Sequence, residues 1–308
     1  MGDTAVGQLV TDPQATYVDA TYGRGGHARR ILQRLGPGGH LIGLDRDPEA
    51  AVDAASISDR RFQFERTRFS RLSQVLTAHS IASIGGLLLD LGVSSPQLDD
   101  PARGFSLRLD GPLDMRMDPD DGPSAAQWLA RVDQGELRRV LRQYGDERFA
   151  SSIAKAIVAR QSAGRPLERT GELAEVVARA IPGKDRKDPN QHPATRTFQA
   201  LRIFINQELE ELALTLQASM VHMATGARLV VISFHSLEDR IVKQFIQAHA
   251  HPDRALPRVP LRAAQLPLAL LRAVARLRAD AAEIAANPRA RSAIMRVAER
   301  TGAPMPAG

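Results

Sequence analysis

The residues after the first expected strand have the types and spacing of a nucleoside-binding turn. The run Asp19–His27 (DATYGRGGH) lies between strand-like residues 17–20 and helix-like residues 28–35. Glycines let a ligand approach the backbone closely, and the free N–H groups at a helix start favour a carboxylate or phosphate. Asp45 lies 20 residues after Gly25, where a carboxylate can accept both ribose hydroxyls. The pattern predicts a nucleoside-containing ligand, with a ligand-free tight turn as the alternative.

The order of the glycines narrows the ligand class. A dinucleotide site prefers three glycines spaced for a pyrophosphate, which the run Gly23–Gly26 does not match. With Asp19 four residues before Gly23, the run resembles the Asp-x-Gly-x-Gly motif of class I methyltransferases, with Thr21 at the place of the first glycine. The sequence has no Gly-Lys-Ser/Thr of a P-loop, so we expect no NTPase. A nicotinamide-dependent oxidoreductase is an alternative that the glycine order disfavours.

A second polar segment, Asp90–Gln97 (DLGVSSPQ), follows the apolar strand expected at 84–91. In an open α/β sheet, ligands bind at the carboxyl ends of the strands. A polar acceptor placed there can meet the amine of a substrate, as in methyltransferases that act on amino groups. The alternative is a solvated turn built by aspartate and serine side chains.

Strand-like and helix-like segments alternate around these motifs. We expect strands at 17–20, 40–44, 62–69, 84–91 and 229–234, and helices at 28–35, 48–55, 195–223 and 237–249. Residues 125–181 are helical in pattern, 94–122 read as a structured loop, and 252–280 fit either a loose connection or a helix. The alternation predicts a parallel sheet covered by helices.

The pattern, taken with the resemblance of the glycine turn to class I methyltransferases, gives the expected fold class: α/β, a Rossmann-like class I methyltransferase sheet with an inserted all-helical domain. The expected domains are 1–103 (methyltransferase domain, first part), 104–192 (inserted helical substrate-recognition domain) and 193–308 (methyltransferase domain, second part).

Composition bounds the partners. The formal net charge is +6 and the sequence contains no cysteine. A modest basic excess favours a polyanionic partner, although a solvated surface explains it as well. Without cysteine, disulfides, iron–sulfur clusters and thiolate zinc sites are excluded. No apolar run approaches the roughly 20 residues that span a bilayer, and we find no secretory signal, so we expect a cytoplasmic protein with no membrane partner.

Longer motifs carry a family resemblance that runs from about Tyr17 to Glu299. The chain closely resembles the bacterial ribosomal RNA small subunit methyltransferase H family in Asp19–His27, Asp90–Ser106 (DLGVSSPQLDDPARGFS), Gly111–Asp118 (GPLDMRMD), Tyr144–Glu147 (YGDE), His192–Arg202 (HPATRTFQALR), Ser233–Arg240 (SFHSLEDR) and Asn287–Ala293 (NPRARSA). The family's usual His-x-Pro-Val segment before the first strand is not found in this sequence, and residues 252–280 match poorly.

The resemblance implies S-adenosylmethionine-dependent N4-methylation of a decoding-centre cytidine in 16S rRNA within the 30S subunit. It implies cofactor contacts at Gly25, Gly26, His27, Asp45, Phe69, Asp90 and Gln97. Asp90 or a loop carbonyl is our candidate acceptor for the target amine, and we expect no metal ion. A non-catalytic RNA-binding ribosome assembly factor is the alternative function, and the oligomeric state, a dimer included, stays open.

Three further interpretations concern charged residues. We expect the inserted domain to grip RNA through basic residues that include Arg138, Arg139, Arg142, Lys184, Arg186 and Lys187. His235 and Asp239 follow the strand at 229–234, where a helix-cap or core role is at least as plausible as catalysis. Acidic residues at 110, 114 and 118 pair more readily with Arg108 and Arg116 than with a metal ion.

Overall fold

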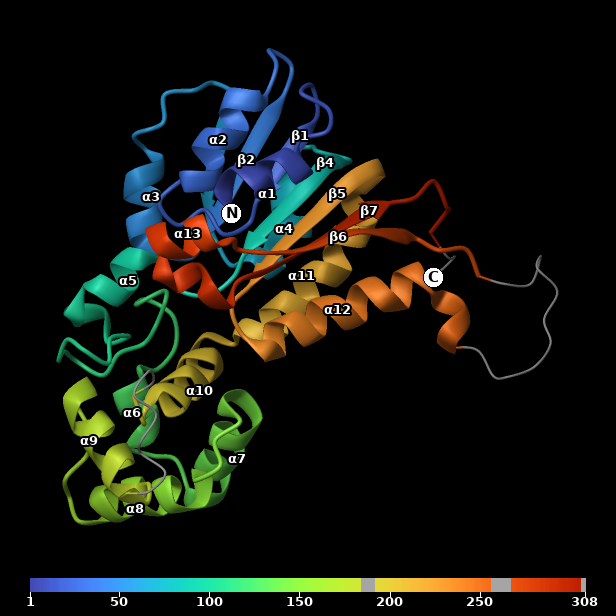
Figure 1. Cartoon of the computed structure of the whole chain (residues 1–308). Helices are drawn as coiled ribbons and strands as arrows, with labels where there is room; N and C mark the ends of the chain where they lie inside the picture. The colour runs from blue at the N-terminus through green and yellow to red at the C-terminus, as the bar shows by residue number, and fades with distance from the viewer. Residues whose placement is uncertain (184–191, 256–266, 306–308) are drawn as a thin grey trace. The chain divides into compact units, whose positions relative to one another are not determined.

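The computed structural model describes residues 1–183, 192–255 and 267–305 and divides into two compact units (Figure 1). The first unit comprises Met1–Gly92 and Leu209–Gly308, and the second comprises Val93–Glu208. Among the described residues, no helix is both long enough and apolar enough to cross a membrane.

The first unit is built on a seven-stranded sheet of order β3-β2-β1-β4-β5-β7-β6. Its strands are β1 (Thr16–Asp19), β2 (His40–Asp45), β3 (Phe62–Arg66), β4 (Ile84–Asp90), β5 (Met223–Ser233), β6 (Leu271–Arg278) and β7 (Ile294–Arg300). Strands β1 to β5 are parallel, whereas β7 is antiparallel to both β5 and β6. The strand order reverses between β1 and β4. The expected α/β fold with a Rossmann-like sheet is confirmed.

Helices cover both faces of this sheet. One buried cluster joins the sheet to α4 (Leu72–Ala78), α11 (Glu208–His222) and α12 (Ser236–Ala250). The other joins it to α1 (Gly2–Leu9), α2 (Gly26–Arg34) and α3 (Pro48–Ala54). A parallel strand in such a sheet is buried on both faces, so its apolar residues are consecutive rather than alternating. In β4, Leu87, Leu88 and Leu89 are such a run, and all three are buried.

The end of the first unit forms an antiparallel hairpin-like edge. The segment 252–280, which the sequence left undecided, contains a short 3-10 helix (Pro252–Ala255) and the edge strand β6. Between β6 and β7 lie α13 (Ala281–Ala286) and a 3-10 helix (Pro288–Ser292). Neither interpretation of 252–280 included a strand, because five of the eight residues of β6 are arginine or alanine and they leave no clear apolar face.

The second unit is helical. It contains α5 (Ser95–Asp99), α6 (Ala125–Leu129), α7 (Gln134–Gly145), α8 (Ala150–Ser162), α9 (Thr170–Ala180) and α10 (Thr195–Asn206). Side-chain caps begin several of them, such as Ser124 at α6 and Asp133 at α7. The second unit, 93–208, is longer at both ends than the expected inserted domain, 104–192. The amide of Asn206 in α10 donates to the Met115 carbonyl, and its oxygen accepts from the Met117 N–H, which ties α10 to the loop.

The prediction of one continuous helix at 195–223 is wrong. The helix breaks at Gln207, which adopts a left-handed conformation with φ +54°, and α10 and α11 lie on either side of it. Arg202 holds Glu208 across this break with two hydrogen bonds of 2.8 and 2.9 Å. A periodic apolar pattern cannot reveal such a break, because the residues on both sides keep helical spacing.

Candidate functional site

Four of the residues singled out in the sequence lie where parallel strands end. His27 follows β1, Asp45 ends β2, Phe69 follows β3 and Asp90 ends β4. The strand order reverses between β1 and β4, and open α/β sheets bind ligands at the carboxyl ends of the strands beside such a reversal. The fold therefore places these residues at the edge where open α/β sheets bind ligands.

The turn after β1 needs its glycines. Gly23 and Gly25 have φ of +56° and +65°, a left-handed conformation that L side chains rarely adopt. A Cβ on Gly25 would also lie 2.5 Å from the Tyr22 hydroxyl oxygen, whereas a Cβ on Gly26 would meet nothing nearer than Arg30 at 3.7 Å. Gly25 is the N-cap of α2 and no side chain caps this helix, so the N–H groups of its first turn face the glycine turn.

Asp45 helps to shape this turn. Its Oδ2 accepts the Gly23 N–H at 2.8 Å, and its Oδ1 accepts the Asp47 N–H at 2.9 Å. Burial raises the pKa of Asp45, and these N–H groups act in the opposite direction. Each carboxylate oxygen has a second lone pair, so Asp45 can still accept hydroxyls from a ligand. The structure thus adds a backbone-bracing role that the sequence did not indicate.

His27 and Asp90 are brought together from the loops after β1 and β4. His27 Nε2 lies 3.2 Å from Asp90 Oδ2, and the backbone N–H of Asp90 donates to Thr21 Oγ1 at 2.6 Å. Burial opposes protonation of His27, but the hydrogen bond and charge of Asp90 outweigh it, so the pKa of His27 lies above its ordinary value. Thr21, at the position where the methyltransferase motif has glycine, therefore connects the two loops.

Asp19 is the residue that the sequence analysis left out of the site. Its side chain is fully buried at the end of β1, and burial raises its pKa from the ordinary 3.8 to about 6. One oxygen accepts the Thr21 N–H, while Oδ2 has no hydrogen-bond partner among the described residues. The sequence signal that could have identified Asp19 as a site residue is its position as the aspartate of the Asp-x-Gly-x-Gly pattern.

Three buried polar atoms near this turn have no hydrogen-bond partner within the described part of the chain: Asp19 Oδ2, His27 Nδ1 and Asp90 Oδ1. Leaving a buried polar group unpaired costs roughly 1–3 kcal/mol. The charges of Asp19 and Asp90 both act on His27, which places the three side chains close together. The arrangement fits a polar ligand that carries positive charge and hydrogen-bonding groups.

Phe69 and Gln97 are less well defined. Phe69 begins a 3-10 helix (Phe69–Arg71) and is half-buried against the core, so its ring is compatible with either base stacking or core packing. Gln97 lies in the second unit, whereas the other predicted cofactor residues lie in the first. There it forms a capping box with Ser94, whose N–H donates to Gln97 Oε1 at 2.9 Å.

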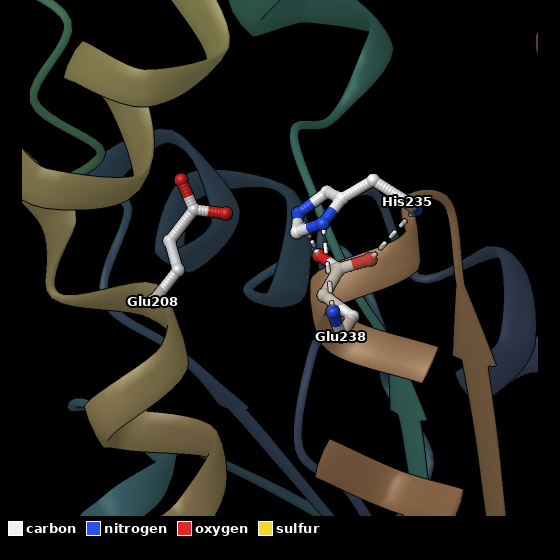
Figure 2. Close-up of side chains that lie close together, drawn as sticks. All are labelled: Glu208, His235 and Glu238. Carbon is white, nitrogen blue, oxygen red and sulfur yellow. Dashed lines mark hydrogen bonds and ion pairs between the residues drawn. The ribbon is translucent and has the colours of Figure 1, made fainter. Parts of the chain in front are cut away.

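His235 has a structural role at the start of α12. It caps the helix by accepting the Glu238 N–H at Nδ1, while the Glu238 carboxylate accepts the His235 N–H (Figure 2). The same carboxylate also accepts the Phe234 N–H. Asp239 accepts two hydrogen bonds from Arg296, at 2.7 and 3.0 Å. The cap interpretation of His235 is thereby confirmed.

Two of the acidic residues in the loop of the second unit are held by arginines. Asp114 binds Arg116 through two hydrogen bonds, and Asp110 binds Arg169 rather than the expected Arg108. Each of these two carboxylates is therefore paired with an arginine.

Known proteins similar to this chain agree with the geometry. The model of the MraW methylase family matches residues 1–301. The "Ribosomal RNA small subunit methyltransferase H" of Ralstonia pickettii (strain 12J) is 55% identical over 305 residues, covering 97% of this chain and 95% of that protein. The protein of the same name from Burkholderia mallei (strain SAVP1) is 54% identical over 301 residues, with the same coverage. A solved structure, "putative rRNA-methylase from Clostridium thermocellum", has a TM-score of 0.43 at 10% identity and covers 97% of this chain and 94% of that chain, a likeness too low to carry an argument.

Proposed function

The chain belongs to the MraW methylase family, and from this premise we propose that it transfers a methyl group from S-adenosylmethionine to the N4 amine of a decoding-centre cytidine in 16S rRNA. The observation that carries the proposal is the group of unpartnered buried atoms of Asp19, His27 and Asp90 at the reversal of the strand order. The relatives that share more than half of their residues with this chain are named for the same class of RNA substrate.

The residues present fit S-adenosylmethionine. When bound, this cofactor supplies a methyl group activated by a sulfonium. Asp45 accepts the ribose hydroxyls, the Gly25–Gly26 backbone receives the methionine carboxylate, and Phe69 stacks on the adenine. Asp19 and Asp90 supply negative charge opposite the cofactor's cationic groups. Support comes from the buried, unpartnered oxygens of these two carboxylates. Gln97 is a further proposed contact on sequence grounds alone.

Asp90 is the proposed acceptor for the target amine. The N4 amine of cytosine is a poor nucleophile because its lone pair is delocalised into the ring. A carboxylate oxygen that accepts an N–H from this amine favours the positive charge that develops on nitrogen. Asp90 Oδ2 is engaged by His27, which leaves Oδ1 available for the amine. Positioning of the amine contributes several kcal/mol more, and no strong base is needed because the proton becomes acidic as the bond forms.

We further propose that the second unit, 93–208, grips the RNA. In α7, Arg138 and Arg142 are exposed and lie one helical turn apart, and Arg139 is exposed beside them. The basic residues Lys184, Arg186 and Lys187 lie outside the described residues. Because the cytidine must leave any stack to reach the carboxyl edge of the sheet, specificity rests mainly on the shape and phosphates around the target. The protein acts on the 30S subunit in the cytoplasm.

The decisive experiment is mass spectrometry of 16S rRNA from cells with and without the gene, paired with methyl transfer to purified 30S subunits in vitro. We expect the N4-methyl group on the decoding-centre cytidine to disappear with the gene and to return with the wild-type protein. An Asp90→Ala variant should bind 30S subunits but transfer little methyl. If the wild-type protein binds rRNA yet never transfers methyl, the alternative of a non-catalytic assembly factor is favoured instead.

A further inference from the structure

The edge of the sheet formed by β6 and β7 carries arginines in an unusual arrangement. Arg276 of β6 lies directly opposite Arg296 of β7 in the antiparallel register. Cross-strand partners have Cβ atoms roughly 4.5–5.5 Å apart, and like charges at this distance repel. Three residues along β7, the charges are complementary instead. Glu299 lies opposite Arg272 of β6 on one side and Arg228 of β5 on the other, and it pairs with both.

A β-bulge separates the arginines of β6 into two groups. The register between β6 and β7 shifts between Ala273 and Ala275, so β6 has one extra residue, Val274, at this point. The side chains of β6 after the bulge therefore lie on the opposite face from the one that strict alternation would give them. Strict alternation would place Arg272, Arg276 and Arg278 on one face. With the bulge, Arg272 shares a face with Glu299, whereas Arg276 and Arg278 share the face of Arg296.

The face of Arg276 and Arg278 is the one covered by α12. Ala298, which alternates with Arg296 along β7, packs in the same buried cluster as Val242 and Phe245 of α12. Figure 1 shows α12 running beside β6. From this helix Asp239 reaches Arg296, and Lys243 lies one turn further along.

Positive charge on this face exceeds the negative charge that the fold supplies. Both oxygens of Asp239 are taken by Arg296, and the charges of Arg276 and Lys243 also act on Asp239 and help to lower its pKa. Within the described residues, the side chains of Arg276, Arg278 and Lys243 form no hydrogen bond or ion pair, and all three are exposed. Guanidinium groups of this kind bind phosphate through two parallel hydrogen bonds.

We propose that this α12-side surface of the sheet edge, carried by Arg276, Arg278 and Lys243, binds the phosphate backbone of the RNA substrate. The inference rests on the proposed function, since it takes rRNA as the substrate. According to this proposal, the first unit, which binds the cofactor, also binds RNA, in addition to the helical second unit. Arginines on an edge strand also discourage edge-to-edge aggregation, and the experiment below separates that role from RNA binding.

The test compares two full-length variants of equal charge. Arg276→Gln removes an unpaired arginine of the proposed surface, and Arg272→Gln removes an arginine of the same strand that Glu299 pairs on the opposite face. Binding to a small-subunit rRNA fragment and to 30S subunits is measured by fluorescence anisotropy over a salt series. Log K falls as log salt rises, and each lost phosphate contact makes this slope shallower by about 0.7–0.9. At 0.1 M salt, the loss of one contact weakens binding roughly fivefold.

We expect this loss for Arg276→Gln, roughly 25-fold weaker binding for Arg276→Gln combined with Arg278→Gln, and no change of slope for Arg272→Gln. Arg276→Lys should retain most of the affinity, because it keeps the charge. S-adenosylmethionine affinity should be the same in all variants, which excludes a folding defect. Equal slopes for Arg276→Gln and Arg272→Gln would overturn the proposal, as would aggregation of Arg276→Gln with unchanged RNA binding. If the wild-type protein itself neither binds nor methylates rRNA, the proposed function fails first and this inference fails with it.

Discussion

Replacing Asp19 with asparagine should stabilise the ligand-free protein and weaken its binding of S-adenosylmethionine. The carboxylate is fully buried, and burial raises its pKa from 3.8 to about 6. At 1.36 kcal/mol per pKa unit, ionisation of Asp19 costs the folded protein about 3 kcal/mol at neutral pH. Asparagine has nearly the same shape and can still accept the Thr21 N–H, but carries no charge. The gain should be less than 3 kcal/mol, since the new amide N–H groups are buried too.

The direction of the pH dependence follows from the raised pKa. Between pH 3.8 and 6 the folded protein holds the Asp19 proton more tightly than the unfolded chain, so the wild-type protein loses stability as the pH rises through this window. The cost is absent below the window and constant above it. Asp19→Asn lacks this term, so its advantage over the wild-type protein should grow by about 1 kcal/mol between pH 5 and 7. Urea unfolding at pH 5, 6 and 7 measures the difference.

Calorimetry supplies the second half of the test. A hydrogen bond to a charged group contributes about 1.5–3 kcal/mol, so loss of the Asp19 charge should weaken S-adenosylmethionine binding about tenfold or more. The control is Asp253→Asn, an exposed change in the same unit that should alter neither quantity. A stability difference that does not vary with pH would refute the buried-charge argument. Unchanged cofactor affinity would remove Asp19 from the site.

Three further outcomes are expected. Asp45→Ala should reduce S-adenosylmethionine affinity at least tenfold by calorimetry, because it removes charge-assisted hydrogen bonds and frees the Gly23 N–H; an unaltered affinity would exclude Asp45 from the cofactor site. Gly25→Ala should lower the free energy of unfolding by about 1–3 kcal/mol because of its positive φ, whereas Gly26→Ala should leave the unfolding midpoint unchanged and weaken only cofactor binding; equal destabilisation would contradict the turn geometry. Methyl incorporation should be much faster into 30S subunits than into naked 16S rRNA or 70S ribosomes at matched salt, and equal rates on 30S subunits and naked RNA would mean that local sequence suffices for recognition.

The cofactor edge could be predicted because its signals are local. The alternation of strand, turn and helix and the distance from Gly25 to Asp45 can be read from the sequence. The structure places Asp45 and Asp90 at the ends of β2 and β4, and His27 at the start of the helix after β1. The helix break at Gln207 and the edge strand β6 were not predictable. Each depends on partners distant in sequence, as Asn206 does on the loop of Met115.

The sequence by itself determined the α/β class, the glycine turn, the placement of most of the proposed cofactor residues and the family, because spacing and motif order are properties of neighbouring residues. Only the tertiary structure decided which side chains lack partners. The contacts His27–Asp90 and Thr21–Asp90 join residues more than sixty positions apart, and they exist only because β1 and β4 are neighbours in the sheet. The buried and unpaired state of Asp19 and the bulge that turns Arg276 toward α12 likewise depend on packing and register, which no local pattern encodes.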